Sequence, residues 1–180
     1  MKILTLLRHA KSGWDDPVER DFDRPLNGRG RRAARTVGAK MRALGLRFDQ
    51  VVASPAVRVV ETLADLSEGY GAPIRPYYDE RAYLASAATL IDIIHEADET
   101  AERLLIVGHN PGLETLALLL SREGGEARAE IAVKYPTAAL VEIGLPVDSW
   151  RDVTEGTGTI ARLLRPRDLD PELGPDEDSF

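Results

Sequence analysis

Apolar and polar positions alternate in blocks along this chain, and the blocks differ in their period. Near-continuous apolar runs at residues 2–9, 48–54 and 103–109 predict short strands that are buried on both faces. Apolar runs at residues 138–145 and 159–166 predict two final strands, adjacent and antiparallel. A sheet built mainly from buried parallel strands follows from this pattern.

Apolar residues with helical spacing fill the intervals between most of these runs. Serine or asparagine stands where a helix cap is needed, and two of these residues are followed by a proline suited to the first turn. The predicted helices run from the Asn27 cap to about Gly45, from Ser54-Pro55 to about Glu68, from the Ser86 cap to Ile94, and from Asn110-Pro111 to about residue 121, and a short extended piece is expected at residues 72–78.

The alternation of strands and helices predicts an α/β fold, specifically a three-layer α/β/α sandwich with a mostly parallel central sheet and an antiparallel edge strand. Ligands of such sheets bind beyond the carboxyl ends of the strands. Three predicted strands end in Arg8-His9, in Ser54-Pro55 and in Gly108-His109. If these strands are parallel neighbours, their polar ends meet in one crevice.

Composition indicates a soluble globular protein, with 43% hydrophobic and 29% charged residues in a chain of 180. The absence of cysteine excludes disulfides, thiolate metal sites and a cysteine nucleophile. The first apolar run is too short for a secretory signal, and no stretch is long enough to span a membrane. We therefore expect a cytoplasmic protein with no membrane partner.

The net charge of −7 is concentrated at the end of the sequence. Residues 166–180 contain six acidic residues and one arginine, which leaves −2 for residues 1–165. Three prolines and no periodicity predict a disordered acidic tail after a single domain of residues 1–165. The near-neutral body argues against nucleic-acid binding.

The chemistry of the predicted crevice favours phosphoryl groups. Arg8 and Arg58 offer forked donors for phosphoryl oxygens, and two helix N-termini add positive potential. A histidine among them, His9 or His109, could attack phosphorus and form a covalent intermediate. A zinc site is disfavoured because these histidines are flanked by arginine or by helix N-termini, so we expect no metal and no cofactor.

Each of these signals has an ordinary structural explanation. Arg58 near the start of its helix opposes the helix dipole, but it could simply pair with Glu61 one turn later. His9 and His109 could each fix a turn. The convergence of two histidines and two arginines on one crevice is what favours function.

The motifs "LLRHAKS", "VVASPAVRVVETL" and "LLIVGHNPGLE" occur in this order, and together they resemble the histidine phosphatase superfamily, with its phosphoglycerate mutase-like fold. The short SixA-type phosphohistidine phosphatases are the most similar subgroup. The resemblance implies that His9 is the nucleophile and that Arg8, Arg58 and His109 form the rest of the phosphate pocket. Lys11 and Ser12 are candidate phosphate contacts.

A general acid is harder to place. The resemblance implies Glu80, in "YYDERAYL", as the acid, with His109 as a further catalytic group, but a glycine-containing continuation found in many relatives is absent. Asp79, Asp16 and Asp23 are alternative acids.

A separate feature of the sequence is a group of basic residues. It has two possible interpretations: a solvated helix face, or a surface near the pocket that docks an acidic phosphoprotein. The group consists of Arg24, Arg29, Arg31, Arg32 and Arg35.

The expected activity is therefore hydrolysis of a phosphoryl group through a covalent phosphohistidine on His9, with a phosphorylated protein, such as a phosphohistidine domain, as partner. A small-molecule phosphomonoesterase or a mutase-like enzyme acting on a phosphorylated metabolite is the alternative enzyme. A non-catalytic phosphate-binding regulatory module is the alternative outside catalysis, because fold does not fix function.

Overall fold

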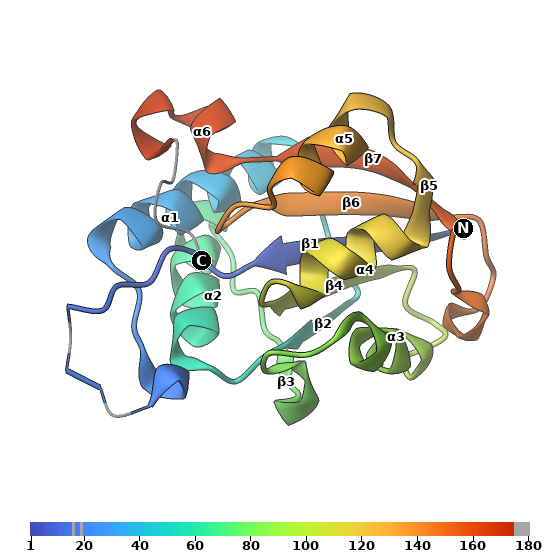
Figure 1. Ribbon diagram of the computed structural model, residues 1–180, viewed down its shortest axis with the longest axis horizontal. Coiled ribbons are helices and arrows are strands. Elements are labelled where there is room, and N and C mark those ends of the chain that lie inside the picture. Colours follow the sequence, from blue (N-terminus) through green and yellow to red (C-terminus); the bar gives the residue numbers. More distant parts are fainter. Residues whose placement is uncertain (16, 19, 175–180) are drawn as a thin grey trace.

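A single mixed sheet of seven strands organises the molecule (Figure 1). The computed structural model describes residues 1–15, 17–18 and 20–174. The strand order is β3-β2-β4-β1-β6-β7-β5, with β6 antiparallel to both of its neighbours and all other pairs parallel. The strands are β1 (Lys2–Arg8), β2 (Gln50–Ala53), β3 (Tyr77–Tyr78), β4 (Arg103–Gly108), β5 (Ser121–Glu123), β6 (Leu140–Leu145) and β7 (Gly158–Leu164).

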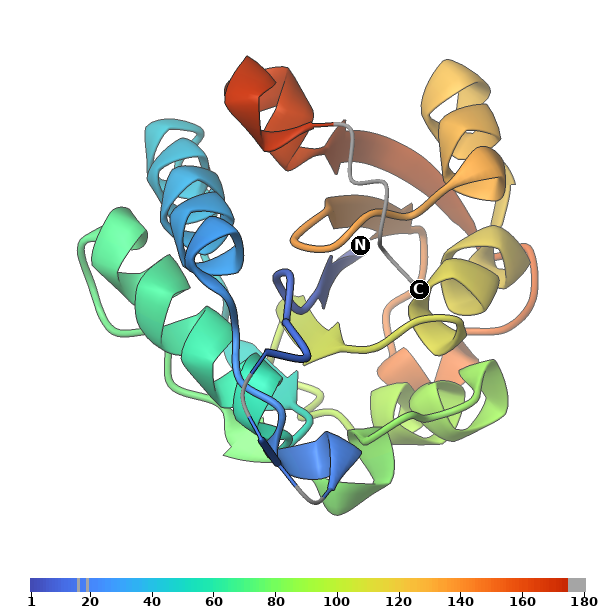
Figure 2. The same ribbon diagram turned by 60° about the vertical axis from the view of Figure 1, so that its left-hand side comes forward.

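Helices cover both faces of this sheet (Figures 1 and 2). Alternate side chains of the central strands enter two separate cores, so that Leu6 joins one and Leu7 the other. One face carries α1 (Gly28–Ala43), α2 (Val57–Tyr70) and α6 (Pro166–Leu169), and the other carries α3 (Ala87–His95), α4 (Gly112–Leu120) and α5 (Gly125–Val133). The predicted three-layer α/β/α class is confirmed.

Most predicted elements are present, with three differences at the level of single elements. Helix α2 begins at Val57, because Ser54 accepts a hydrogen bond from the Ala56 amide in a turn that precedes the helix. The extended piece at residues 72–78 pairs with the sheet only at β3. The short elements β5 and α5 were not predicted, since a three-residue strand and a helix with little amphipathic character leave no periodic signal.

Residues 166–174 differ from the disordered tail that the sequence predicts. They form α6 and a 3-10 helix at Pro171–Leu173, which pack beside α1. Leu173 is buried in the same core as α1 and α2, and Arg32 of α1 forms ion pairs with Asp170 and Glu172. Burial of one leucine and these ion pairs order a segment that has no periodicity of its own. Residues 175–180 lie outside the described residues.

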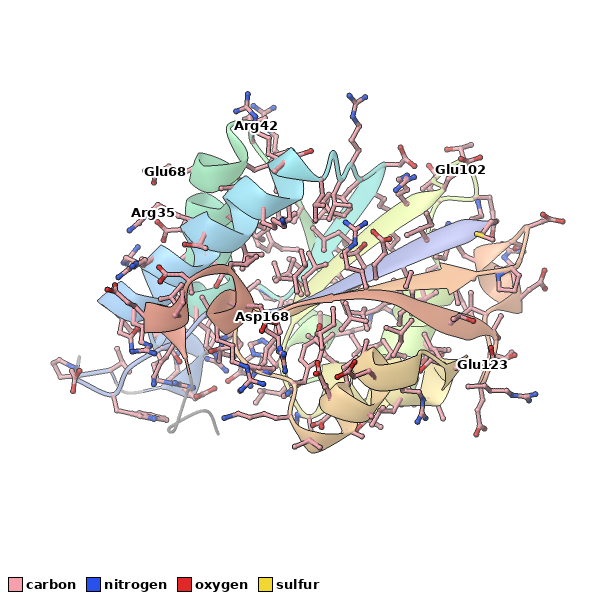
Figure 3. The ribbon with its side chains drawn as sticks, turned by 90° about the horizontal axis from the view of Figure 1, so that it is seen from above. Arg35, Arg42, Glu68, Glu102, Glu123 and Asp168 are labelled. Atoms are coloured by element: carbon pink, nitrogen blue, oxygen red, sulfur yellow. The ribbon has the colours of Figure 1, made fainter. Side chains whose placement is uncertain are left out.

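Within the described ranges, no helix is long and apolar enough to cross a membrane. Figure 3 shows the breadth of the molecule, with Arg35 on α1 and Glu68 on α2 at one side and Glu102 and Glu123 at the far end of the sheet. The carboxyl ends of β1, β2 and β4 lie at the opposite end from Glu102, which precedes β4.

Candidate active site

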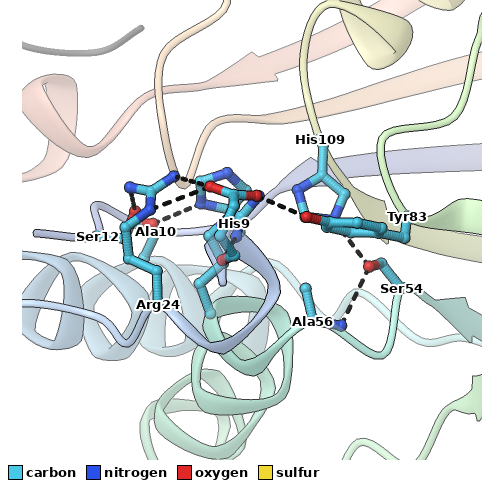
Figure 4. Close-up of polar contacts among 10 residues, drawn as sticks. His9, Ala10, Ser12, Arg24, Ser54, Ala56, Tyr83 and His109 are labelled. Atoms are coloured by element: carbon cyan, nitrogen blue, oxygen red, sulfur yellow. Dashed lines mark hydrogen bonds and ion pairs between the residues drawn. The ribbon is translucent and has the colours of Figure 1, made fainter. Parts of the chain in front are cut away.

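Three parallel strands end side by side and deliver the predicted residues to one place. Strand β4 pairs with both β1 and β2, so that the residues following these strands, His9, Ser54 and His109, become neighbours. The ring centroids of His9 and His109 are 5.2 Å apart. Figure 4 shows both imidazoles and Ser54 in one cluster with Tyr83, which comes from the segment after β3. The sequence-based expectation that these strand ends meet is confirmed.

His9 is buried and held in one tautomer. Its Nδ1 lies 2.7 Å from the carbonyl oxygen of Ala10, and because a carbonyl only accepts, Nδ1 carries the proton. The other ring nitrogen, Nε2, therefore presents a lone pair. Burial, more than any other cause, holds the pKa of His9 well below its usual value, and the nearby His109 and arginines lower it further. His9 is thus a neutral imidazole with a nucleophilic nitrogen.

His109 faces His9 and is also neutral. Burial and the charge of Arg58 lower its pKa to about 3. Its Nε2 lies 2.7 Å from the Ser54 hydroxyl, whereas its buried Nδ1 has no hydrogen-bond partner among the described residues. When the Ser54 hydroxyl donates to Nε2, Nδ1 carries a proton and can donate to an entering oxygen. The Tyr83 ring packs edge-on against His109 with centroids 5.4 Å apart.

Two arginines bring positive charge to the same cluster, although both are almost fully buried. Arg8 is the last residue of β1, and its Nη1 donates to the carbonyl of Tyr135 at 2.9 Å. Arg58 lies in the first turn of α2, where it does not pair with Glu61. Glu61 instead accepts from Arg31 of α1 at 3.0 Å. The pairing of Arg58 with Glu61 that would have explained this cation locally is therefore excluded.

Arg58 is oriented by a residue that sequence reasoning missed, Asp21. Arg58 Nη1 donates to the backbone carbonyl of Asp21 at 2.9 Å, and Arg58 Nη2 donates to the Asp21 carboxylate at 3.0 Å. The Tyr83 hydroxyl donates to the same carboxylate oxygen at 2.7 Å. Burial alone would raise the pKa of Asp21, but the Tyr83 hydrogen bond and the Arg58 charge together lower it to about 2. The Asp21 carboxylate is therefore ionised at neutral pH.

A further cation joins Asp21 from the same loop. Arg24 contacts the second carboxylate oxygen of Asp21 at 3.2 Å and donates to the Ser12 hydroxyl, as Figure 4 shows for Arg24 and Ser12. No sequence pattern marks Asp21 or Tyr83, because they lie 62 positions apart and meet only across a loop. An unbalanced excess of arginines around one histidine is the signal that could have indicated a nearby carboxylate.

The first loop after β1 lies beside the cluster and is fixed by a close contact with α1. Gly30 packs against the loop backbone so tightly that a Cβ atom would lie 2.1 Å from the Lys11 carbonyl oxygen. The backbone amide of Asn27 donates to that same carbonyl. The Asn27 side chain accepts a hydrogen bond from the Gly30 amide and so caps α1, as predicted. This contact positions Lys11 and Ser12 next to His9.

The other predicted acids are placed less favourably. Glu80 is exposed at the start of a 3-10 helix (Glu80–Ala82) and forms no side-chain hydrogen bond or ion pair with a described residue. A hydrogen bond from Arg81 lowers the pKa of Asp79, and Asp23 pairs with Arg20 at the surface. Asp16 lies outside the described residues.

The predicted group of basic residues is divided by the structure. Arg31 and Arg35 pair with Asp65 of α2, Arg32 pairs with the C-terminal segment, and Arg24 joins the active-site cluster. Arg29 differs, because it forms no ion pair with a described residue and lines a small pocket with Lys11. Among the described residues, no group of three or more His, Cys, Asp or Glu side chains could hold a metal ion.

This arrangement suits transfer of a phosphoryl group. A neutral imidazole nitrogen faces two guanidinium groups and a second imidazole. All four groups are buried near the carboxyl ends of the central strands. Donors fixed in advance around an anion, in a site screened from water, are the main requirement for phosphoryl transfer.

Comparisons with known proteins agree with this chemistry. The model of the histidine phosphatase superfamily, branch 1, matches residues 4–83. An uncharacterised protein of Mycobacterium tuberculosis is 36% identical over 164 residues, which cover 89% of this chain and all of the relative.

Two solved structures, both of candidate phosphohistidine phosphatases SixA, are similar over nearly the whole chain. The protein from Nakamurella multipartitia is 25% identical with a TM-score of 0.77, covering 92% of this chain and 96% of the other. The protein from Agrobacterium tumefaciens is 28% identical with a TM-score of 0.74, covering 92% and 98%.

The fold and the family match define a phosphatase with a phosphoglycerate mutase-like fold. The chain belongs to the histidine phosphatase superfamily and is of the SixA type.

Proposed function

We propose that this phosphatase removes phosphoryl groups from phosphohistidine residues of proteins, by way of a covalent intermediate on His9. Two structures that are similar over more than nine-tenths of this chain are described as candidate phosphohistidine phosphatases SixA. The buried cluster of Arg8, His9, Arg58 and His109 supplies the groups that such a reaction needs.

The reaction proceeds in two displacements. In the first, Nε2 of His9 attacks phosphorus, the phosphorus–nitrogen bond of the substrate breaks, and the substrate imidazole leaves with a proton from solvent. In the second, water attacks the phosphorylated His9, the new phosphorus–nitrogen bond breaks, and inorganic phosphate is released. Arg8, Arg58 and the Nδ1–H of His109 bind the phosphoryl oxygens as negative charge develops on them. The Nδ1 hydrogen bond to Ala10 keeps His9 in the attacking tautomer.

The observation that carries the substrate assignment is the lack of a protonated carboxyl group at the described site. The Asp21 carboxylate is ionised, with a pKa of about 2, and the Glu80 side chain is exposed and forms no hydrogen bond or ion pair with a described residue. An alkoxide leaving group needs strong protonation, typically worth 10²–10⁴-fold in rate. Imidazole leaves more readily, because the pKa of its conjugate acid is about 6.5. A site poor in acid therefore favours phosphohistidine over phosphate esters.

The test compares initial rates on a phosphohistidine peptide with those on a phosphoserine peptide of the same sequence. We expect the phosphohistidine peptide to react at least about 100-fold faster, in line with the contribution of a missing acid. Brief reaction followed by an alkaline quench should leave acid-labile phosphate on the protein, and His9→Ala should abolish both label and turnover. His95→Ala, which removes a histidine bonded to the Val153 carbonyl far from the cluster, is the matched control.

Two results would contradict the proposal. Equal rates on the two peptides would indicate a general phosphomonoesterase with an acid such as Glu80, and Glu80→Gln should then slow only the phosphoserine reaction. If the His9→Ala variant still carried acid-labile phosphate, a residue other than His9 would be the nucleophile. Rates should also be unchanged by EDTA, since Arg8, Arg58 and His109 supply the charge in the proposed mechanism.

A further inference from the structure

A small basic pocket lies beside the active site and has no role in the reaction described above. It lies between the loop after β1, the start of α1, the segment before β6 and the C-terminal segment. Five basic residues line it, and no carboxylate among the described residues does. These residues are Lys11, Arg29, Lys134, Arg165 and Arg167. We refer to it as the basic side pocket.

The segments that line the basic side pocket are next to the catalytic cluster along the chain and are hydrogen-bonded to its backbone. Lys11 follows His9 by two positions, and the Ala138 amide donates to the carbonyls of both Arg8 and His9, at 3.1 and 3.0 Å. Lys134 lines the basic side pocket and also a neighbouring hollow that contains Arg8. A substrate whose phosphoryl group reaches His9 therefore passes close to this pocket.

The basic side pocket combines positive charge with an apolar floor. The floor includes Ala33, Pro166 and Leu173, which are buried. Arg165 is already paired with Asp168 at 2.7 Å, whereas Arg29 and Arg167 form no ion pair with a described residue. A carboxylate at this position would find two such guanidinium groups, and its methylene groups would rest on the floor.

The size of the basic side pocket limits what can bind there. Its volume is about 30 Å³, enough for one or two water-sized groups. A single carboxylate fits this space.

We propose that the basic side pocket binds the side chain of an acidic residue that lies near the phosphohistidine in the substrate protein. This inference rests on the proposed function, and it makes the enzyme selective for phosphorylated sites with an acidic neighbour. Arg29 and Arg167 supply most of the selectivity, while the reacting groups remain those around His9.

The test uses phosphohistidine peptides that carry a single glutamate at successive positions on either side of the phosphohistidine, each paired with a peptide carrying glutamine instead. We expect KM to be about tenfold lower for the best glutamate peptide, as two partly exposed ion pairs would give, with kcat unchanged. The advantage should shrink as the salt concentration rises, because the pocket opens to solvent.

The variant R29Q/R167Q should lose this advantage and keep the wild-type rate on the glutamine peptides. The matched control is Arg47→Gln, which removes an exposed arginine that does not line the basic side pocket. If R29Q/R167Q retains the preference, or if wild type shows none at any position, the proposal is wrong. It is also wrong if a preference appears only after Asp176, Glu177 and Asp178 are neutralised, since the chain's own acidic residues would then be the occupant.

Failure of the proposed function can be recognised separately. If no phosphohistidine peptide is hydrolysed, the reaction has been assigned wrongly, and the basic side pocket is then tested by binding alone. Fluorescence anisotropy of the labelled glutamate and glutamine peptides gives their Kd values with wild type and R29Q/R167Q. Equal values for both peptides with wild type would overturn the proposal.

Discussion

At the scale of single residues, the protonation states of two histidines prepare the site. Both pKa values are lowered, His9 mainly by burial and His109 by burial and Arg58. Each imidazole is therefore neutral where an ordinary surface histidine would begin to take up a proton. In the proposed mechanism His9 can attack without a neighbouring base, because its tautomer is fixed by the Ala10 carbonyl.

These shifts predict how stability depends on pH. Below about pH 6.5 the unfolded chain binds a proton at His109 that the folded protein does not bind until about pH 3, so stability falls as pH falls through this window. His109 alone should lower the free energy of unfolding by about 1.6 kcal/mol between pH 6.5 and pH 5. Urea unfolding at both pH values checks this, and His109→Asn should reduce the pH dependence by that amount.

Nitrogen NMR of the histidine rings provides an independent measurement. At pH 5.5 both His9 and His109 should give neutral-ring signals, and His9 should carry its proton on Nδ1. A His109 ring that is half protonated near pH 6.5 would contradict both the assigned pKa shift and the stability prediction.

At the scale of elements, helix α1 and the loop after β1 behave as one unit. Gly30 and the Asn27 cap both contact the carbonyl oxygen of Lys11, two residues beyond His9. A glycine is required at position 30 because a Cβ atom there would meet backbone rather than a movable side chain. The helix therefore sets the position of the loop that carries His9.

Gly30→Ala should consequently damage both stability and activity. Forcing a methyl group into this contact should cost about 1–3 kcal/mol of unfolding free energy and displace the loop, lowering kcat/KM at least about tenfold. Chemical unfolding and initial rates on a phosphohistidine peptide measure the two effects. Gly28→Ala, where a Cβ atom meets nothing within 4 Å, is the control and should behave as wild type. Normal activity in Gly30→Ala would show that the loop position does not depend on α1.

At the scale of the whole molecule, the C-terminal segment completes the domain. Leu173 enters the core shared by α1 and α2, and Arg32 anchors the same segment. Through Leu173, this segment also contributes to the apolar floor of the basic side pocket.

Leu173→Ala tests this role. Removing a buried leucine near the edge of a core should cost about 2 kcal/mol, which lowers Tm by roughly 4–8 °C for a domain of this size. Glu172→Ala, at an exposed site whose partner Arg32 is also exposed, should change Tm by less than about 2 °C. Thermal unfolding that is identical in Leu173→Ala and wild type would mean that the segment does not contribute to the core.

The sequence predicted those parts of the site that regular elements carry. Arg8, His9 and His109 stand at strand ends and Arg58 at a helix start, so apolar periodicity and cap residues were enough to bring them together. Asp21 and Tyr83 could not be predicted this way, because both lie outside regular strands and α-helices and their contact depends on the path of a loop.

The C-terminal segment and the basic side pocket also could not be predicted from local sequence patterns. Residues 166–174 have no helical period, and they are ordered by contacts with α1 that no local pattern encodes. The basic side pocket draws its lining from segments more than 100 positions apart, so the separation of Arg29 from its neighbours Arg31 and Arg32 became visible only in three dimensions.

The ion pair between Asp21 and Arg58 also bears on the end of each catalytic cycle. In the proposed mechanism Arg58 binds the phosphate product. The Asp21 carboxylate lies 3.0 Å from the Arg58 guanidinium and repels a departing phosphate ion of the same sign. Retention of the product is therefore weaker than Arg8 and Arg58 alone would give. A phosphatase with such a site is less inhibited by the phosphate that it releases, and its site is free sooner for the next substrate.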